Sequence, residues 1–485
     1  MVQTSMEREI QCAFPRNRLA SRVITTTRKE DVAASCSFPD DDFVYSMKPL
    51  DANDLQDLFL SRIFKDEVDF PQELKQVTTD ILRKCDGLPL AIVSIASMLA
   101  TKPASRQEWE RVRDSICSAS QPNHEHEIIE QILFMSYYDL PHQLKTCFLY
   151  LSQFPEDCEI NRLLLIRRWV AEGFITEQRG QSLEDTAHSY FTELVNRNMI
   201  QPVHIDYYGM PGACRAHDIM LDLIKSLAAK ENFSIVMNDV KAVFLPNKIR
   251  RLSVQGNFWQ GTNISNTRSL SCFGPVKNLP PLFQFKILRV LDIEGCSSAQ
   301  NSGYPESICT LVHLRYLRLV DSSIKRLEGD IGRMKSLKTL DLSLTLIEQL
   351  PAGVTKLKQL VHLFVPFTVT LPKGIGKMEA LEELSVLNAI KTSPEALEEL
   401  EKLEKLKVLN IMWNPADGIS DQETMKRSLI KSFCRLGENN LRSIYIEGSD
   451  RCCMNFMAES WCPPPKHVRR FCMEGLVPLF SKFPS

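Results

Sequence analysis

Few residues of this 485-residue sequence have the types and spacing that chemistry requires. The segment from Ser21 to Arg28, SRVITTTR, is a β-branched run closed by an arginine, which predicts a buried strand that ends at a functional loop. His124 and His126 lie in an acidic linker, where a metal site would need further ligands at helix or loop spacing. No Ser/His/Asp or Cys/His set has a recognisable local signature. We therefore expect neither a catalytic site nor a metal site.

The sequence also lacks a complete phosphate-binding loop. Such a loop has the pattern G-x-x-x-x-G-K-[ST] and opens a helix, so that backbone amides face the phosphates. The nearest segment, Gly374 to Lys377, lies between two repeats and lacks both the first glycine and the Ser/Thr. An acidic strand end that could hold Mg²⁺ is missing too, because Asp40 to Asp42 follow a Phe-Pro pair and predict a solvated loop.

The composition narrows the class of protein. Apolar residues make up 44% and charged residues 24%, which are ordinary values for a globular chain and rule out wholesale disorder. A formal net charge of −2 provides no broad basic field for nucleic acid or an anionic membrane. The fifteen cysteines form no C-x-x-C pair, and no apolar signal segment opens the chain, so we expect a reducing compartment, the cytoplasm or the nucleus. The longest apolar run, Gly87 to Ala100, is too short to span a bilayer.

The second half of the chain is a repeat array. The pattern L-x-x-L-x-L recurs with first positions 26, 23, 23, 21 and 25 residues apart, which fits the leucine-rich repeat. The copies begin at Leu288, Leu314, Leu337, Leu360, Leu381 and Leu406, and degenerate copies begin at Ile249, Thr267, Leu441 and Val468. Each copy should give one short strand of a curved parallel sheet, because a single repeat cannot bury its own apolar face.

The polar residues between the repeat leucines should face the concave side of this solenoid. Arg318, Lys338, Asp341 and Glu383 are examples. The segment from Glu395 to Lys407 predicts the convex helix of one repeat. A longer gap between the copies at Leu406 and Leu441 predicts an inserted helix near Asp421 to Leu436.

The first half of the chain carries shorter signals, mostly helical. Asp51 or Asn53 can cap a helix that presents Leu55, Leu58 and Phe59 on one face. The segment CDGLPLAI, residues 85–92, places a glycine and a proline at the junction of two helices. Helices followed by short extended pieces predict a winged-helix unit at roughly 140–230.

In this order and at this spacing, these segments resemble the nucleotide-binding (NB-ARC) module of plant NB-ARC leucine-rich-repeat disease-resistance proteins. SRVITTTR resembles the sensor strand of the family, CDGLPLAI its GLPL motif and RAHDIMLDLI its MHD motif. CFLYLSQFPEDCEI with RRWVAEGFI resembles the coiled-coil, non-TIR subclass. The resemblance extends from about Ile10 to Ser485.

The resemblance implies a mixed α/β fold with four parts. Residues 1–48 would be a remnant of the P-loop nucleotide-binding subdomain, and residues 49–125 a helical subdomain with the GLPL motif. Residues 126–235 would form a winged-helix domain with the MHD-like motif. Residues 245–485 would form the leucine-rich-repeat horseshoe.

The resemblance also assigns a nucleotide site. The residues that match its motifs are Thr27, Arg28, Gly87, Pro89, His217 and Asp218. By this likeness Arg28 would read the terminal phosphate, Pro89 would pack on adenine, and His217 would contact the ADP phosphate, with Asp218 orienting the neighbouring backbone and helix. Ala216 stands where the family usually has methionine.

In this family ADP locks a closed form, and exchange for ATP opens it and permits oligomerisation. Because the P-loop and the acidic strand motif are missing, we expect a chain that begins in mid-domain and has negligible affinity for nucleotide. The leading interpretation is an immune-receptor fragment whose repeats bind protein partners, such as a pathogen effector, a guarded host protein or intact receptors.

Other interpretations stay open at this point. The chain could be an interaction-only regulator or decoy, or an ATPase if a longer product supplied the upstream motifs. A DNA-binding winged helix would use Arg162, Arg167 and Arg168, but Trp169 and its apolar neighbours predict that this helix packs in a core.

Overall fold

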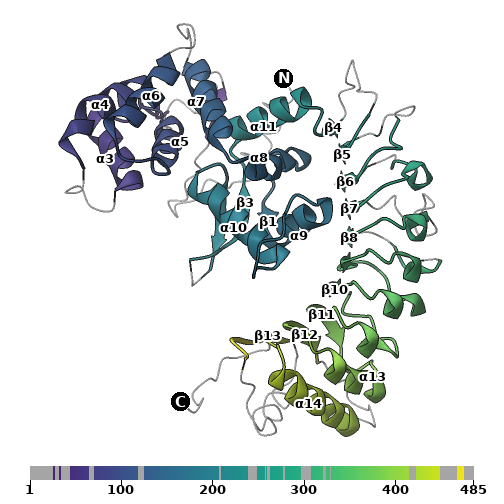
Figure 1. Ribbon diagram of the computed structural model, residues 1–485. Helices are drawn as coiled ribbons and strands as arrows, with labels where there is room; N and C mark the ends of the chain where they lie inside the picture. The colour runs from purple at the N-terminus through teal and green to yellow at the C-terminus, as the bar shows by residue number, and fades with distance from the viewer. Residues whose placement is uncertain are drawn as a thin grey trace, which may run out of the picture.

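In the computed structural model of the protein, three groups of elements follow one another along the chain: a cluster of helices, a unit of helices and short strands, and a long curved sheet (Figure 1). The described residues are 26–27, 32–33, 44–64, 70–117, 125–206, 209–238, 248–256, 258, 263–276, 279–296, 307–320, 324–327, 329–413, 422–447 and 467–474.

The first group is a cluster of amphipathic helices. Helix α3 (Ala52–Ile63) begins where the Asp51 carboxylate accepts hydrogen bonds from two backbone amides at 2.9 and 3.0 Å, which confirms the expected cap. The others are η2 (Gln72–Leu74), α4 (Lys75–Lys84), α5 (Pro89–Leu99) and α6 (Arg106–Cys117). Phe59 and Trp109 are fully buried and meet edge to face, so aromatic packing ties α3 to α6.

The second group has the winged-helix arrangement that the sequence predicts. Its elements are α7 (Glu125–Asp139), α8 (His142–Leu149), η3 (Tyr150–Gln153), β1 (Ile160–Asn161), α9 (Arg162–Glu172), α10 (Leu183–Asn196), β2 (Gln201–Ile205), β3 (Pro211–Arg215) and α11 (Asp218–Lys230). Strand β3 pairs antiparallel with both β1 and β2. Trp169 and Phe191 are fully buried in the core of this unit, so α9 is a core helix, as expected.

The third group is a parallel sheet in which strands pair in chain order. Its strands are β4 (Ile235–Met237), β5 (Arg251–Val254), β6 (Ser269–Phe273), β7 (Val290–Glu294), β8 (Tyr316–Val320), β9 (Thr339–Asp341), β10 (His362–Phe364), β11 (Glu383–Asn388), β12 (Val408–Met412), β13 (Ser443–Glu447) and β14 (Arg470–Glu474). Equivalent leucines pair from strand to strand, as Leu270 does with Leu291 and Leu291 with Leu317. Their side chains are fully buried, so stacked repeats share one core.

Short helices line the convex side of this sheet. They are η4 (Leu282–Gln284), η6 (Ile308–Thr310), η7 (Ile331–Arg333), η8 (Ala352–Lys356), η9 (Ile375–Lys377), α13 (Pro394–Glu398), η10 (Glu399–Lys402) and α14 (Gln422–Glu438). Helices α13 and α14 confirm the expected convex helix and insertion. The GIGK segment forms η9 in the repeat array, after Gly374 at a φ of +90°, and therefore does not form a phosphate-binding loop.

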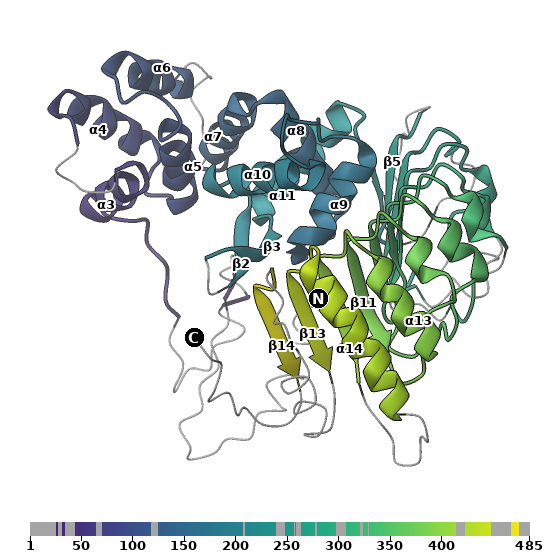
Figure 2. The same cartoon turned by 60° about the horizontal axis from the view of Figure 1, so that its bottom comes forward.

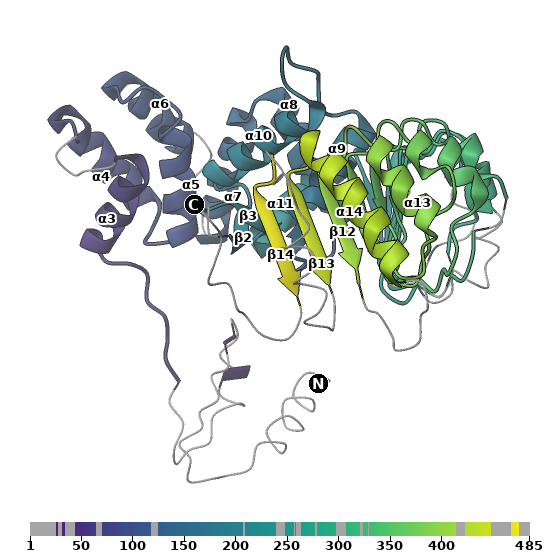
Figure 3. The same cartoon turned by 90° about the horizontal axis from the view of Figure 1, so that it is seen from below.

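The winged-helix unit fills the concave side of the horseshoe (Figures 1 and 2). Helix α9 packs on β7 and β8, and η3 packs on β4 and β5. Near the other end of the arc, Arg470 of β14 forms an ion pair with Asp206, beside the β2–β3 hairpin, at 3.4 Å. Helices α3 to α6 lie on the far side of the winged-helix unit from the repeats (Figure 3).

The mixed α/β fold class is confirmed, and two details differ from expectation. Thr26 and Thr27 are exposed and lie in no strand, although the sequence predicts a buried strand there; the rest of that segment, with Arg28, lies outside the described residues. The sheet also starts at Ile235, earlier than the first repeat pattern, because β4 pairs with β5. Within the described residues, no helix is long and apolar enough to cross a membrane.

Candidate functional site

The turn between α4 and α5 carries two of the residues assigned to nucleotide binding. Gly87 has a φ of +74°, and its carbonyl accepts a hydrogen bond from the Leu50 amide at 3.1 Å. A Cβ at this glycine would lie 2.4 Å from the Cβ of Pro49, so a side chain does not fit. Pro89 is exposed and takes the first position of α5, where its missing amide hydrogen removes no helix bond. The turn is therefore fixed by backbone geometry.

The start of α11 carries two more of the candidate residues. His217 immediately precedes the helix, and its side chain does not cap it. The Nδ1 atom of His217 is buried and has no hydrogen-bond partner in the described part of the chain. Asp218 is the first residue of α11, where the positive end of the helix dipole stabilises a carboxylate. Ala216 is buried in the winged-helix core, which accounts for an apolar residue at that position.

The turn between α4 and α5 and the start of α11 are linked through packing. Leu88 and Leu90, on either side of Pro89, pack against the buried cluster of the winged-helix unit, to which Ala216 also belongs. Helix α7 packs on both α5 and α11. Thr27 is exposed, and Arg28 lies outside the described residues. Buried polar atoms are normally hydrogen-bonded, and the Nδ1 of His217 is one of the exceptions among the described residues.

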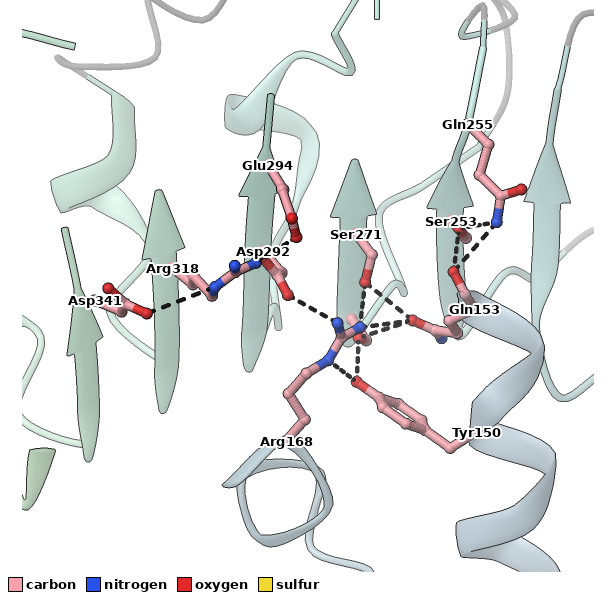
Figure 4. A network of polar contacts seen from close by, with 11 residues as sticks. Tyr150, Gln153, Arg168, Ser253, Gln255, Ser271, Asp292, Glu294, Arg318 and Asp341 are labelled. Carbon is pink, nitrogen blue, oxygen red and sulfur yellow. Dashed lines mark hydrogen bonds and ion pairs between the residues drawn. The ribbon is translucent and has the colours of Figure 1, made fainter. Parts of the chain in front are cut away.

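The most extensive polar site of the described residues lies between α9 and the repeat strands (Figure 4). At its centre is Arg168 of α9, whose side chain is fully buried. Its Nη1 donates to Asp292 Oδ2 of β7 at 2.8 Å, and its Nε donates to the Tyr150 hydroxyl at 3.0 Å. Its Nη2 donates to the Ser271 hydroxyl of β6. The guanidinium also lies over the ring of Phe154, 4.6 Å from its centroid.

Charges of alternating sign continue the site across the next strands. The second carboxylate oxygen of Asp292 accepts from Arg318 of β8 at 3.0 Å. Arg318 also pairs with Glu294 at 2.7 Å and with Asp341 of β9 at 3.5 Å. The surrounding carboxylates raise the pKa of Arg318, although burial opposes them, and burial raises the pKa of Asp341. This series of ion pairs from Arg168 to Asp341 thus links one arginine of the winged-helix unit to strands β7, β8 and β9.

The helix η3 adds neutral hydrogen bonds to the same interface. The backbone carbonyl of Gln153 accepts from the Ser253 hydroxyl of β5 at 2.6 Å. The Tyr150 hydroxyl lies 3.3 Å from that of Ser269 in β6. These partners come from the CFLYLSQFPEDCEI segment, whose sequence resembles that of the coiled-coil subclass. Hydrogen bonds between buried polar groups make this interface specific, although Gln153 Nε2 has no partner among the described residues.

A second charged contact lies further along the arc. Arg167 of α9 pairs with Glu383 of β11, and its guanidinium lies 4.9 Å from the ring centroid of Phe364. His362 of β10 lies 3.0 Å from Glu184 of α10. Burial alone would raise the pKa of Glu184, but the hydrogen bond from His362 and its charge outweigh burial and lower that pKa to about 2.

Sequence reasoning did not identify the residues of this interface. It placed Arg318, Asp341 and Glu383 on the concave side, where they do lie, but it expected them to face outward rather than the winged-helix unit. The signal that could have found the interface is an Arg-Arg pair inside the apolar helix around Trp169, because a buried arginine needs an acidic partner. Among the described residues, no cluster of three or more His, Cys, Asp or Glu side chains could hold a metal ion.

Comparisons with known proteins agree with this architecture. Residues 154–224 match the family described as the disease resistance protein winged helix domain, and residues 266–485 match a leucine-rich repeat region. Disease resistance protein RGA5 of Oryza sativa subsp. japonica is 33% identical over 382 residues, which cover 77% of this chain and 34% of that protein.

Two further relatives have the same relation to the chain. Disease resistance protein Pik-2 of Oryza sativa subsp. japonica is 33% identical over 73% of this chain and 36% of its own length. Disease resistance protein RPM1 of Arabidopsis thaliana is 33% identical over 64% of this chain and 34% of its own length. The chain thus spans about a third of the length of the curated relatives it matches. It is a relative of the plant disease-resistance proteins and carries their winged-helix domain followed by a leucine-rich repeat region.

Proposed function

We propose that this chain functions as part of a plant intracellular immune receptor, in which the leucine-rich repeats restrain the winged-helix unit. The observation that carries the proposal is the ion pair between Arg168 and Asp292, in which both side chains are shielded from solvent. Residues that would otherwise be available on the concave surface are engaged by α9. A protein partner that competes for this surface would therefore also disturb the winged-helix unit.

The cost of leaving one buried charge unpaired favours a contact that is made or lost as a whole. Removing one partner from a buried, hydrogen-bonded ion pair costs about 3–5 kcal/mol, because the other charge is left unpaired. Arg168 has four protein partners besides its aromatic neighbours, so the contact is either made in full or lost together. The disease-resistance relatives make a defence role the natural reading of such a restraint.

A nucleotide switch of the family's kind would need a phosphate-binding loop, which this sequence does not contain. By family likeness, ADP would contact His217 and Pro89, and exchange for ATP would move the winged-helix unit. The unpartnered Nδ1 of His217 supports a ligand at this place. The sequence offers no P-loop for the phosphates, so we propose that this chain acts by binding proteins and not by catalysis. A regulator or decoy that interacts with intact receptors without nucleotide is the alternative.

A nucleic-acid role has less support. Of the three arginines of α9, Arg162, Arg167 and Arg168, the last two form ion pairs with the repeats. A recognition helix must present such side chains to DNA. The function would be exerted in the cytoplasm or the nucleus.

The test compares two charge reversals after expression in leaf tissue. Asp292→Lys places a cation beside Arg168, whereas Glu438→Lys reverses an exposed pair with Arg435 on α14. We expect only Asp292→Lys to raise hydrogen exchange in α9 and to alter defence-associated cell death or co-purification with intact receptors. Raised exchange with an unchanged response would refute the proposed coupling.

A further inference from the structure

The residues immediately before the repeat strands form a ladder of positive charge. Arg268, Arg289, Arg315 and Lys338 each donate a backbone amide to the carbonyl of the preceding member, at 2.7–2.8 Å, starting from Arg250. Adjacent strands lie about 4.8 Å apart, so the backbone positions that carry these five side chains follow one another at about that spacing. We call these five residues the cationic ladder.

The ladder is electrostatically unfavourable by itself. Burial and the neighbouring arginines, Arg289 and Arg250 among them, lower the pKa of Arg268. Arg289 is partly compensated, because its Nη1 donates to the Glu172 carbonyl at the end of α9 at 3.3 Å. In the described part of the chain, no carboxylate pairs with Arg315 or Lys338, and both are half-buried. Two positive charges are thus left without a counterion.

These two cations border a cavity of about 160 Å³ between the winged-helix unit and the repeats. One side of the cavity is lined by repeat residues, including Arg315 and Lys338 of the cationic ladder. The other side is lined by α9 and the start of α10. Water occupies about 30 Å³ per molecule, so the cavity has room for about five waters or one small polar group. Drug-sized ligands need about 300 Å³ or more, which restricts the ligand to a compact group.

The other charged side chains of the cavity have contacts of their own. Glu184 lies 3.0 Å from His362, and Glu382 lies 2.5 Å from Lys407. Arg167 pairs with Glu383 outside the lining. The start of α10, a helix of 14 residues, is already capped by Ser182 and Asp185, and Glu184 and Asp185 place negative charge in its first turn. Arg315 and Lys338 are therefore the cations of the lining that have no carboxylate partner among the described residues.

We propose that this cavity binds a phosphate group of a small phosphorylated molecule, held by Arg315 and Lys338 and bridging the winged-helix unit to the repeats. A phosphate has the compact size and the multiple acceptors that suit two cations lining one small cavity. The site is separate from the GLPL and MHD-like positions, so the inference stands independently of the proposed nucleotide switch. Its ligand would strengthen the contact that restrains the winged-helix unit.

The test is calorimetric titration of the full chain with inorganic pyrophosphate at fixed ionic strength. The wild type should bind saturably and gain thermal stability. Arg315→Gln combined with Lys338→Gln should weaken binding about tenfold for each cation removed. Arg333→Gln combined with Lys335→Gln is the matched control, because these exposed residues carry the same charge and do not line the cavity.

Four results would overturn the assignment. Equal weakening in the control would mean binding to general surface charge. Sulfate binding as tightly as pyrophosphate would mean a site without preference for phosphate. Absence of saturable binding to the wild type would mean that no such site exists. Loss of binding in His217→Ala, with the cavity variant unaffected, would locate the anion at the nucleotide position and equally refute the cavity.

Discussion

Arg168 and Asp292 stand 124 positions apart in the sequence and form an ion pair of 2.8 Å in which neither side chain is more than 1% exposed. Such a pair is costly to bury and is retained only when further hydrogen bonds compensate the lost hydration. Tyr150 and Ser271 supply those bonds for Arg168, and Arg318 supplies one for Asp292. The winged-helix unit and the repeats therefore depend on each other for the pairing of their buried charges.

The first prediction concerns the stability of this pair. Asp292→Ala should lower the free energy of unfolding by about 3–5 kcal/mol, because Arg168 is left buried without its carboxylate. Glu438→Ala is the control, since Glu438 also accepts from an arginine, Arg435, at 2.9 Å but lies on the exposed face of α14. It should cost less than about 1 kcal/mol. Urea denaturation followed by tryptophan fluorescence measures both.

A double replacement tests whether the charges of Arg168 and Asp292 are energetically coupled. Replacing both partners, as in Arg168→Met with Asp292→Leu, removes the unpaired charge and should recover part of the loss seen in Asp292→Ala. A double variant as unstable as the sum of the two single variants would show that the charges are not coupled, contrary to the geometry.

The second prediction concerns pH and the contact between Glu184 and His362. The pKa of Glu184 is lowered to about 2 from an ordinary 4.5, so its stabilising contribution is complete above about pH 5. That contribution is lost as the pH falls from about 4.5 towards 2, because the folded state then takes up a proton later than the unfolded state. Since the side chain is about a third exposed, we expect a contribution of about 2 kcal/mol.

The matched variant for this prediction is Glu184→Gln. Its stability should fall below that of the wild type at pH 7, and the two curves should converge near pH 2. Thermal unfolding between pH 2 and 7 measures the difference. A difference in stability that stays constant down to pH 2 would mean that the contact with His362 does not lower the pKa of Glu184 in the folded state.

Local signals account for most of what the sequence predicted. Each repeat carries its own L-x-x-L-x-L pattern, and the Asp51 cap depends on residues two and three positions away, so neither needs knowledge of the fold. The pairing of Arg168 with Asp292 depends on how α9 sits against the sheet, which no local pattern encodes. Strand β4 was missed because three residues without the repeat leucines gain their strand partner only from β5.

The third prediction concerns the nucleotide. We expect the purified chain to carry no stoichiometric ADP after gel filtration, because the sequence has no P-loop to supply backbone amides and a lysine to the phosphates. Nucleotide extracted from the protein and quantified by chromatography measures this. Stoichiometric ADP that disappears in His217→Ala would contradict the expectation and would identify His217 Nδ1 as a ligand contact.

The last prediction separates backbone strain from steric exclusion at the GLPL turn. Gly87 and Gly180 have similar φ angles, +74° and +80°, but a Cβ would meet Pro49 at 2.4 Å in the first case and nothing within 4 Å in the second. Gly180→Ala should therefore cost only the strain of a left-handed alanine, about 1 kcal/mol. Gly87→Ala should cost clearly more, because the Pro49 backbone must also move before α3 can pack on α5. Melting temperatures of the two variants measure the difference, and equal losses would mean that the segment at Pro49 yields without cost.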